Sequence, residues 1–111
     1  MELNEYQKKA AKTAFYPEKY KIIYSSIGLI NEAGEVMGKI KKWLRGDDGE
    51  GEEMSKERKL ALKDELGDVL WYLAILSKDL GFKLDDIAKI NIEKLQSRQK
   101  RNMLKGNGDK R

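Results

Sequence analysis

Apolar residues recur along most of this chain at the three- and four-residue spacing of an amphipathic α-helix. Two long segments show the pattern most clearly. One runs from about Glu18 to Leu44, and the other begins after Ser55, its predicted N-cap, and ends at about Leu80. The apolar positions of the first are Ile22, Ile23, Ile27, Ile30, Val36, Met37, Ile40 and Trp43. Those of the second are Leu62, Leu66, Val69, Leu73, Leu76 and Leu80. Gly81 follows directly and is typical of a helix C-terminus.

Two further helices complete the pattern. The N-terminal one is predicted from about Leu3 to Phe15, because Pro17 disfavours helix in the residue before it. The last runs from about Leu84 to Met103. The stretch 45–53 is polar, glycine-rich and aperiodic, which predicts a mobile loop. We therefore expect an all-α, four-helix bundle in residues 1–105 and a flexible basic C-terminal tail in residues 106–111.

The composition agrees with one small helical domain. Of the 111 residues, 40% are hydrophobic and 38% charged, and there is a single proline. The net charge of +4 suits an anionic ligand only weakly, because much of the excess lies near the C-terminus. No apolar run is long enough to span a bilayer, and the N-terminus lacks a signal-peptide pattern. These features predict a cytoplasmic protein with no membrane partner.

Four short helices with apolar residues on more than one side leave surface that one chain cannot cover. Helices from a second copy would complete the bundle, and its C-terminal tail would reach the neighbouring site. We therefore expect a homodimer or homotetramer.

Two pairs of acidic residues interrupt the long apolar helices. Glu32 and Glu35 form one pair and Glu65 and Asp68 the other, each spaced i, i+3, so both carboxylates of a pair point to the same side of their helix. Four carboxylates across a helix–helix seam repel one another strongly, which calls for a cation. The chain has no Cys and no His, so carboxylate oxygen is the expected ligand, and Mg²⁺ or Mn²⁺ the expected ion.

The alternative for these acids is a set of solvated charges paired with Lys39 or Lys63; their apolar flanks favour the cation site. Glycines offer a second hint of function. Gly28, Gly34 and Gly38 lie inside the second helix, where each costs about 1 kcal/mol relative to alanine. Their presence indicates close approach by another segment or a ligand.

The residues also resemble a known family. Asn31-Glu32-Ala33-Gly34-Glu35 followed by Glu65-Leu66-Gly67-Asp68 is similar to the EExxE…ExxD pattern of the MazG-like, all-α nucleoside triphosphate pyrophosphohydrolases, with Asn31 in place of the first Glu. Segments 28–36, 65–73 and 91–95 with Arg98, and the tail 106–111, resemble family segments in the family's order. The likeness covers nearly the whole chain.

This resemblance implies Mg²⁺-dependent hydrolysis of (deoxy)nucleoside triphosphates to the monophosphate and pyrophosphate; whether Mn²⁺ replaces Mg²⁺ stays open at this point. Glu32, Glu35, Glu65 and Asp68 would be the metal ligands and catalytic residues. One of them, Glu32 or Glu35, would take the proton of the attacking water. No nucleic-acid partner is expected.

Further residues are candidates for substrate binding. Asn91, Lys94 and Arg98 share one stripe of the fourth helix and could contact phosphates; spacing alone favours a solvated face, whereas the resemblance favours Asn91 and Lys94 as contacts. Lys39 and Lys42 are weaker candidates. Tyr72, four residues after Asp68, and Trp43 could stack on a base, although aromatic residues at this spacing are more often core.

Two other functions remain open from the sequence. The chain could be a helical binding module for a partner or nucleic acid, with contacts made by the basic tail and no catalysis. It could instead be a phosphohydrolase that acts on a different phosphate chain. The products released from triphosphates would separate these hypotheses.

Overall fold

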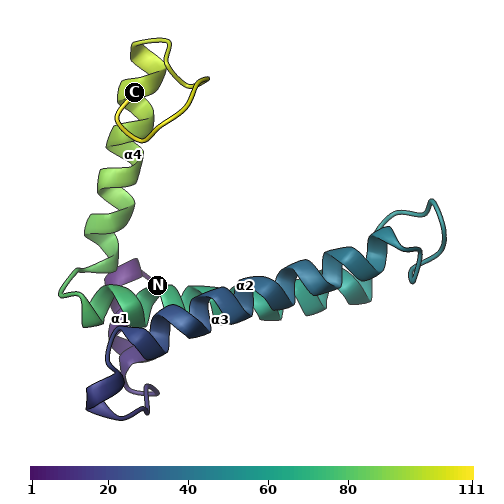
Figure 1. Ribbon diagram of the computed structural model, residues 1–111, viewed down its shortest axis with the longest axis horizontal. Helices are drawn as coiled ribbons and strands as arrows, with labels where there is room; N and C mark the ends of the chain where they lie inside the picture. The colour runs from purple at the N-terminus through teal and green to yellow at the C-terminus, as the bar shows by residue number, and fades with distance from the viewer.

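The computed structural model describes residues 1–111 and contains only helices (Figure 1). In chain order these are α1 (Leu3–Ala11), a 3₁₀ turn (Glu18–Tyr20), α2 (Ile23–Leu44), α3 (Lys56–Asp79) and α4 (Leu84–Lys100). The prediction of an all-α fold with four helices is therefore confirmed.

The four helices form two arms rather than a closed bundle. Helices α2 and α3 pair as a long hairpin, α1 crosses the end of that hairpin, and α4 projects away from it (Figure 1). The radius of gyration is 17.3 Å, whereas a compact domain of about 100 residues has a value of about 13 Å. Only nine residues are buried. One chain thus leaves the space between its arms open.

The small core lies where the arms meet, and a buried amide organises it. Gln7 of α1 donates from Nε2 to the carbonyls of Ala74 (3.1 Å) and Phe82 (3.0 Å), and its Oε1 accepts from the backbone N–H of Leu84 (3.1 Å). One side chain therefore ties α1 to the end of α3 and the start of α4. The apolar residues buried around it are Ala10, Ala74, Ile75 and Leu84.

The first two helices are shorter than predicted. Helix α1 ends at Ala11 and not at Phe15, and α2 begins at Ile23 and not at Glu18. Helix α2 begins late because the chain makes a tight turn at Ile22, whose φ of 73° is costly for a branched residue. Its backbone N–H donates to Asp79 of α3 (3.3 Å). This long-range contact holds the turn.

The other helix ends follow their local signals closely. Ser55 caps α3 by accepting the N–H of Arg58 (3.1 Å), and Gly81 follows α3 with φ +84°, both as predicted. Helix α4 ends at Lys100 and not at Met103, because Asn102 adopts φ 58° and the chain turns back there.

The loop between α2 and α3 was expected to be mobile, but an ion pair anchors it. Arg58 donates to both oxygens of Asp48 (2.8 to 2.9 Å) and to the carbonyl of Lys39 (3.2 Å), while Asp48 also accepts the N–H of Ser55 (3.1 Å). The Asp48 side chain is only 6% exposed. Periodicity could not reveal this contact, because it joins a loop residue to a helix ten residues later.

The Asp48–Arg58 pair predicts a stability change in acid. The Arg58 guanidinium, partly opposed by desolvation, lowers the pKa of Asp48 to about 2. A lowered folded-state pKa gives stability that is present above the unfolded value, about 4, and is lost as the pH falls towards 2. In thermal unfolding from pH 5 to pH 2, Asp48→Asn should be less stable than wild type at pH 5, and the difference should shrink in acid. A stability difference between wild type and Asp48→Asn that stays constant from pH 5 to pH 2 would contradict this role.

Among the helix glycines, Gly28 has a clear reason within one chain. A Cβ at Gly28 would lie 2.0 Å from Cε1 of Tyr72 on α3, so the aromatic ring occupies the space of the missing side chain. No atom would lie within 4 Å of a Cβ at Gly34 or Gly38. The close approach predicted for these glycines is therefore seen at Gly28 alone.

Gly28→Ala should consequently destabilise the protein. The new methyl must displace the Tyr72 ring, and overpacking of this kind costs about 1–3 kcal/mol, more than the helix propensity gained. Gly38→Ala, which meets nothing in the chain, is the matched control. Chemical denaturation measures the effect, and equal stability of the two variants would show that Tyr72 moves without cost.

Candidate metal centre

Three of the four predicted acids converge between α2 and α3. Carboxylate oxygens of Glu32, Glu65 and Asp68 lie within 4.8 Å of one another. Glu32 and Glu65 are half-buried, whereas Asp68 is exposed. Glu35, one turn further along α2, is exposed and lies outside this acidic cluster. The pairing of α2 with α3 thus brings together three of the four acids that were expected to meet, and Glu35 lies at the edge of this group.

The electrostatics of the acidic cluster favour an added cation. Burial raises the pKa of Glu32, and the nearby carboxylates of Asp68, Glu65 and Glu35 raise it further. Lys39 Nζ lies 3.0 Å from Glu65 Oε1, which is one of the pairings considered as the alternative for these acids. Three carboxylates and one ammonium group leave two negative charges, which a divalent cation would offset. The oxygen-only donor set suits Mg²⁺ or Mn²⁺.

A cavity of about 350 Å³ opens beside the cluster. Its lining residues are Thr13, Glu32, Asp68, Trp71 and Tyr72. Trp71 donates from Nε1 to Thr13 Oγ1 (2.8 Å) and packs edge-on against Tyr72, with ring centroids 4.9 Å apart. The cavity therefore joins carboxylates to an aromatic wall, a combination that suits a flat ring attached to a charged group.

The sequence located Tyr72 at this cavity but missed Thr13. Thr13 follows α1, and only the crossing of α1 over α3 brings it to Trp71, so no local pattern could reveal it. Trp43 lies near the far end of α2, where its Nε1 donates to the carbonyl of Glu52 (3.1 Å). Lys42, together with Lys39, borders a separate cavity near the Asp48–Arg58 pair.

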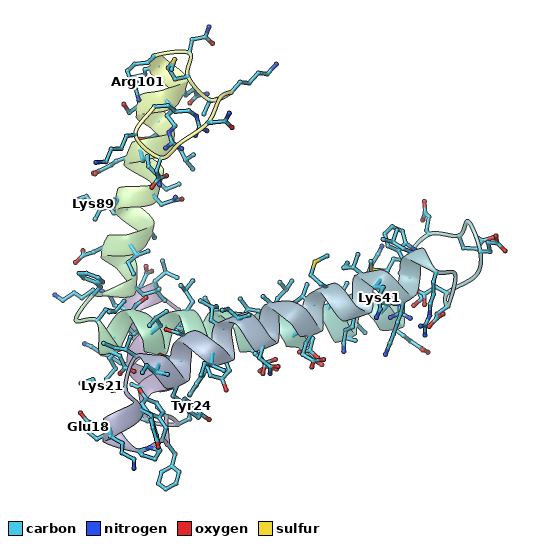
Figure 2. The ribbon with its side chains drawn as sticks, viewed as in Figure 1. Glu18, Lys21, Tyr24, Lys41, Lys89 and Arg101 are labelled. Carbon is cyan, nitrogen blue, oxygen red and sulfur yellow. The ribbon has the colours of Figure 1, made fainter.

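The candidates on α4 lie on the other arm. In Figure 2, Arg101 beside the terminal loop and Lys41 on the hairpin mark the outer parts of the two arms. Asn91 lines a hollow at the junction, whereas Lys94 pairs with Asp109 of the tail and Arg98 is buried beneath the tail. Within one chain the structure does not bring Lys94 and Arg98 to the acidic cluster.

Together these features define an all-α protein with a cluster of three carboxylates on a helical hairpin. Comparison with known proteins gives the family. The model of the MazG nucleotide pyrophosphohydrolase domain matches residues 26–103, which include all four predicted acids. The chain belongs to this family, and the match supports nucleotide pyrophosphohydrolase activity.

Two relatives support the same alignment. The chain is 39% identical over 117 aligned positions to the Gene 37 protein of Mycobacterium phage L5, and all of both chains is covered. It is 38% identical over 72 positions to the uncharacterized protein YvdC of Bacillus subtilis, covering 63% of this chain and 68% of the relative. No solved structure matches. No helix is both long and apolar enough to cross a membrane.

Proposed function

We propose that this protein hydrolyses (deoxy)nucleoside triphosphates to the monophosphate and pyrophosphate in a reaction that requires Mg²⁺, with Mn²⁺ as a substitute, and that it does so in the cytoplasm. The observation that carries the proposal is the convergence of Glu32, Glu65 and Asp68, with two negative charges left uncompensated. A triphosphate is itself highly negative. An acidic site can hold it only through bridging divalent cations.

Each acid has a role in this proposal. Glu32, Glu65 and Asp68 hold the cation, and Glu35 completes its ligand set or, like Glu32, accepts the proton of the attacking water. When bound, Mg²⁺ offsets phosphate charge and lowers the pKa of water. Lys39 pairs with Glu65 at the edge of the cluster, and in this proposal its ammonium group exchanges Glu65 for a phosphate oxygen when the substrate binds.

The aromatic cavity is the place for the nucleoside. Tyr72 and Trp71 form one wall beside Glu32 and Asp68, so a base packed there leaves its phosphates at the cation site. Trp43 is a base contact only if the loop that now accepts its N–H moves. This assignment rests on the cavity's position next to the carboxylates.

In this proposal the active unit is a homodimer or a homotetramer. Mostly apolar residues recur along one side of α2 at alternating spacings of four and three residues, which is the spacing of a helix–helix seam. This side of α2 is uncovered in one chain. The residues on this exposed stripe are Ile23, Ile27, Ile30, Gly34, Met37, Lys41 and Leu44. The exposed fraction reaches 76% at Ile30. A second copy lying between the arms would cover the stripe and bring Asn91, Lys94 and Arg98 to its partner's acidic cluster.

Product analysis tests the function directly. The protein is incubated with a panel of common nucleoside and deoxynucleoside triphosphates and Mg²⁺, and the products are separated by anion-exchange chromatography. We expect monophosphate and pyrophosphate in equal amounts. Orthophosphate as the product would indicate a different phosphohydrolase, and no turnover of any triphosphate would contradict the proposal. No specific feature favours the binding-module alternative, because Arg101 and Arg111 are engaged within the tail.

A further inference from the structure

The C-terminal residues form a closed loop that folds back along α4. The guanidinium of Arg111 donates to the carbonyls of Met103 (3.1 Å), Leu104 (3.0 Å) and Gly108 (2.6 Å). Arg101, just after α4, donates to the carbonyl of Arg111 (2.8 Å). The flexibility predicted for residues 106–111 stays a prediction, but these contacts give the tail a defined path.

Asp109 is the point at which this terminal loop meets α4. Its Oδ1 lies 2.9 Å from Lys94 Nζ and 3.3 Å from Arg98 Nη2, and its backbone carbonyl accepts a further hydrogen bond from Arg98 Nη2. The hydrogen bonds from Lys94 and Arg98 lower the pKa of Asp109 and so favour its ionised form. One acidic residue of the tail therefore contacts both cations of α4 that the sequence analysis named as candidates for phosphate binding.

The two cations keep donors free for a further anion. The Arg98 residue is only 5% exposed, and its buried Nε–H has no partner. The Lys94 ammonium group donates one hydrogen bond, to Asp109, out of three possible, and its side chain is 35% exposed. A buried guanidinium with an unused donor beside a half-exposed ammonium group is an incomplete anion site.

We propose that Asp109 is a positioning residue, which holds Lys94 and Arg98 in place so that their remaining donors receive the substrate's phosphates. Free Lys and Arg side chains lose considerable rotamer entropy when they bind an anion, and a carboxylate that already fixes them removes part of that cost. The inference rests on the proposed function, because it takes the triphosphate as the anion.

The opposite role for Asp109 makes a different prediction. If its carboxylate only competed with phosphate for Lys94 and Arg98, then removing its charge would strengthen the binding of a triphosphate. If it positions the two cations, removing that charge weakens binding even though the site becomes more positive. The sign of the change therefore separates the two roles.

The test is Asp109→Asn in the full chain, measured by steady-state hydrolysis of the best triphosphate. We expect KM to rise about tenfold, the scale of one lost charge-assisted contact, with kcat within about twofold of wild type. Asp109→Glu should recover part of the loss, and Lys110→Gln, a change at a neighbouring exposed tail residue, should leave KM unchanged. An unchanged or lower KM in Asp109→Asn would overturn the inference.

A double-mutant cycle tests whether Asp109 acts through Arg98. Adding Asp109→Asn to Arg98→Gln should raise KM by clearly less than Asp109→Asn does in wild type, the remainder acting through Lys94; fully additive effects would contradict positioning. If the wild type hydrolyses no triphosphate, the proposed function fails by itself. Calorimetric titration with inorganic tripolyphosphate and Mg²⁺ then decides this inference, with about tenfold weaker binding expected for Asp109→Asn and equal or tighter binding overturning it.

Discussion

Asp68→Asn should reduce pyrophosphate release from triphosphates by about 100-fold or more, while the helical fold remains intact. Asp68 is exposed and makes no hydrogen bond or ion pair within the chain, so its charge has no structural partner to lose. Its carboxylate nevertheless completes the cluster with Glu32 and Glu65. Losing one of three oxygen ligands weakens the hold on the cation and on the phosphates that it bridges. Initial rates at saturating Mg²⁺ measure the effect.

The matched control is Asp64→Asn. Asp64 lies on the same helix and is also exposed, but it is outside the acidic cluster. This variant should keep wild-type turnover, since it removes the same charge without touching the cation site. Equal losses in both variants would mean that overall charge matters and that the cluster does not.

Ile30→Glu should convert the protein to monomers of 12.8 kDa and lower turnover at least about tenfold. Ile30 is 76% exposed in one chain, so a glutamate there meets no steric obstacle within the chain. At a helix–helix seam between two copies, however, the charge would be buried without a partner. Turnover should fall because the monomer loses Lys94 and Arg98 of its neighbour. Light scattering after size exclusion gives the mass.

Asn31→Glu serves as the control for the assembly only, because Asn31 lies next to Glu32 in the acidic motif. It adds the same charge one residue along α2, away from the exposed stripe, and should keep the assembly. A wild-type protein that is monomeric at micromolar concentration, or an Ile30→Glu dimer with full activity, would contradict a shared active site.

Much of the fold could be predicted from the sequence, because local patterns specify helices. Spacing located all four helices, and the caps at Ser55 and Gly81 were identified from single residues. The errors fall where a distant residue decides the local structure. Asp79 of α3 holds the turn at Ile22, and Arg58 of α3 anchors Asp48 of the loop. Neither partner is visible in the segment that it fixes.

In the candidate site, too, local spacing predicted some features, whereas others depend on contacts between distant segments. The i, i+3 spacing puts Glu65 and Asp68 on one side of α3, and the pairing of α2 with α3 brings Glu32 to them, whereas Glu35 stays outside the cluster. Thr13 was missed because α1 reaches the cavity only through its crossing angle. The direction of α4 depends on the buried Gln7 amide, a long-range contact that helical periodicity does not encode.

The most direct test of the metal centre is to measure Mn²⁺ binding. Electron paramagnetic resonance monitors it, because the signal of free Mn²⁺ decreases as the ion binds. The account predicts that wild-type protein binds Mn²⁺, that Mg²⁺ competes for the same site, and that Asp68→Asn and Glu65→Gln bind much more weakly. Binding of equal strength in wild type and both variants would contradict a cation site at Glu32, Glu65 and Asp68.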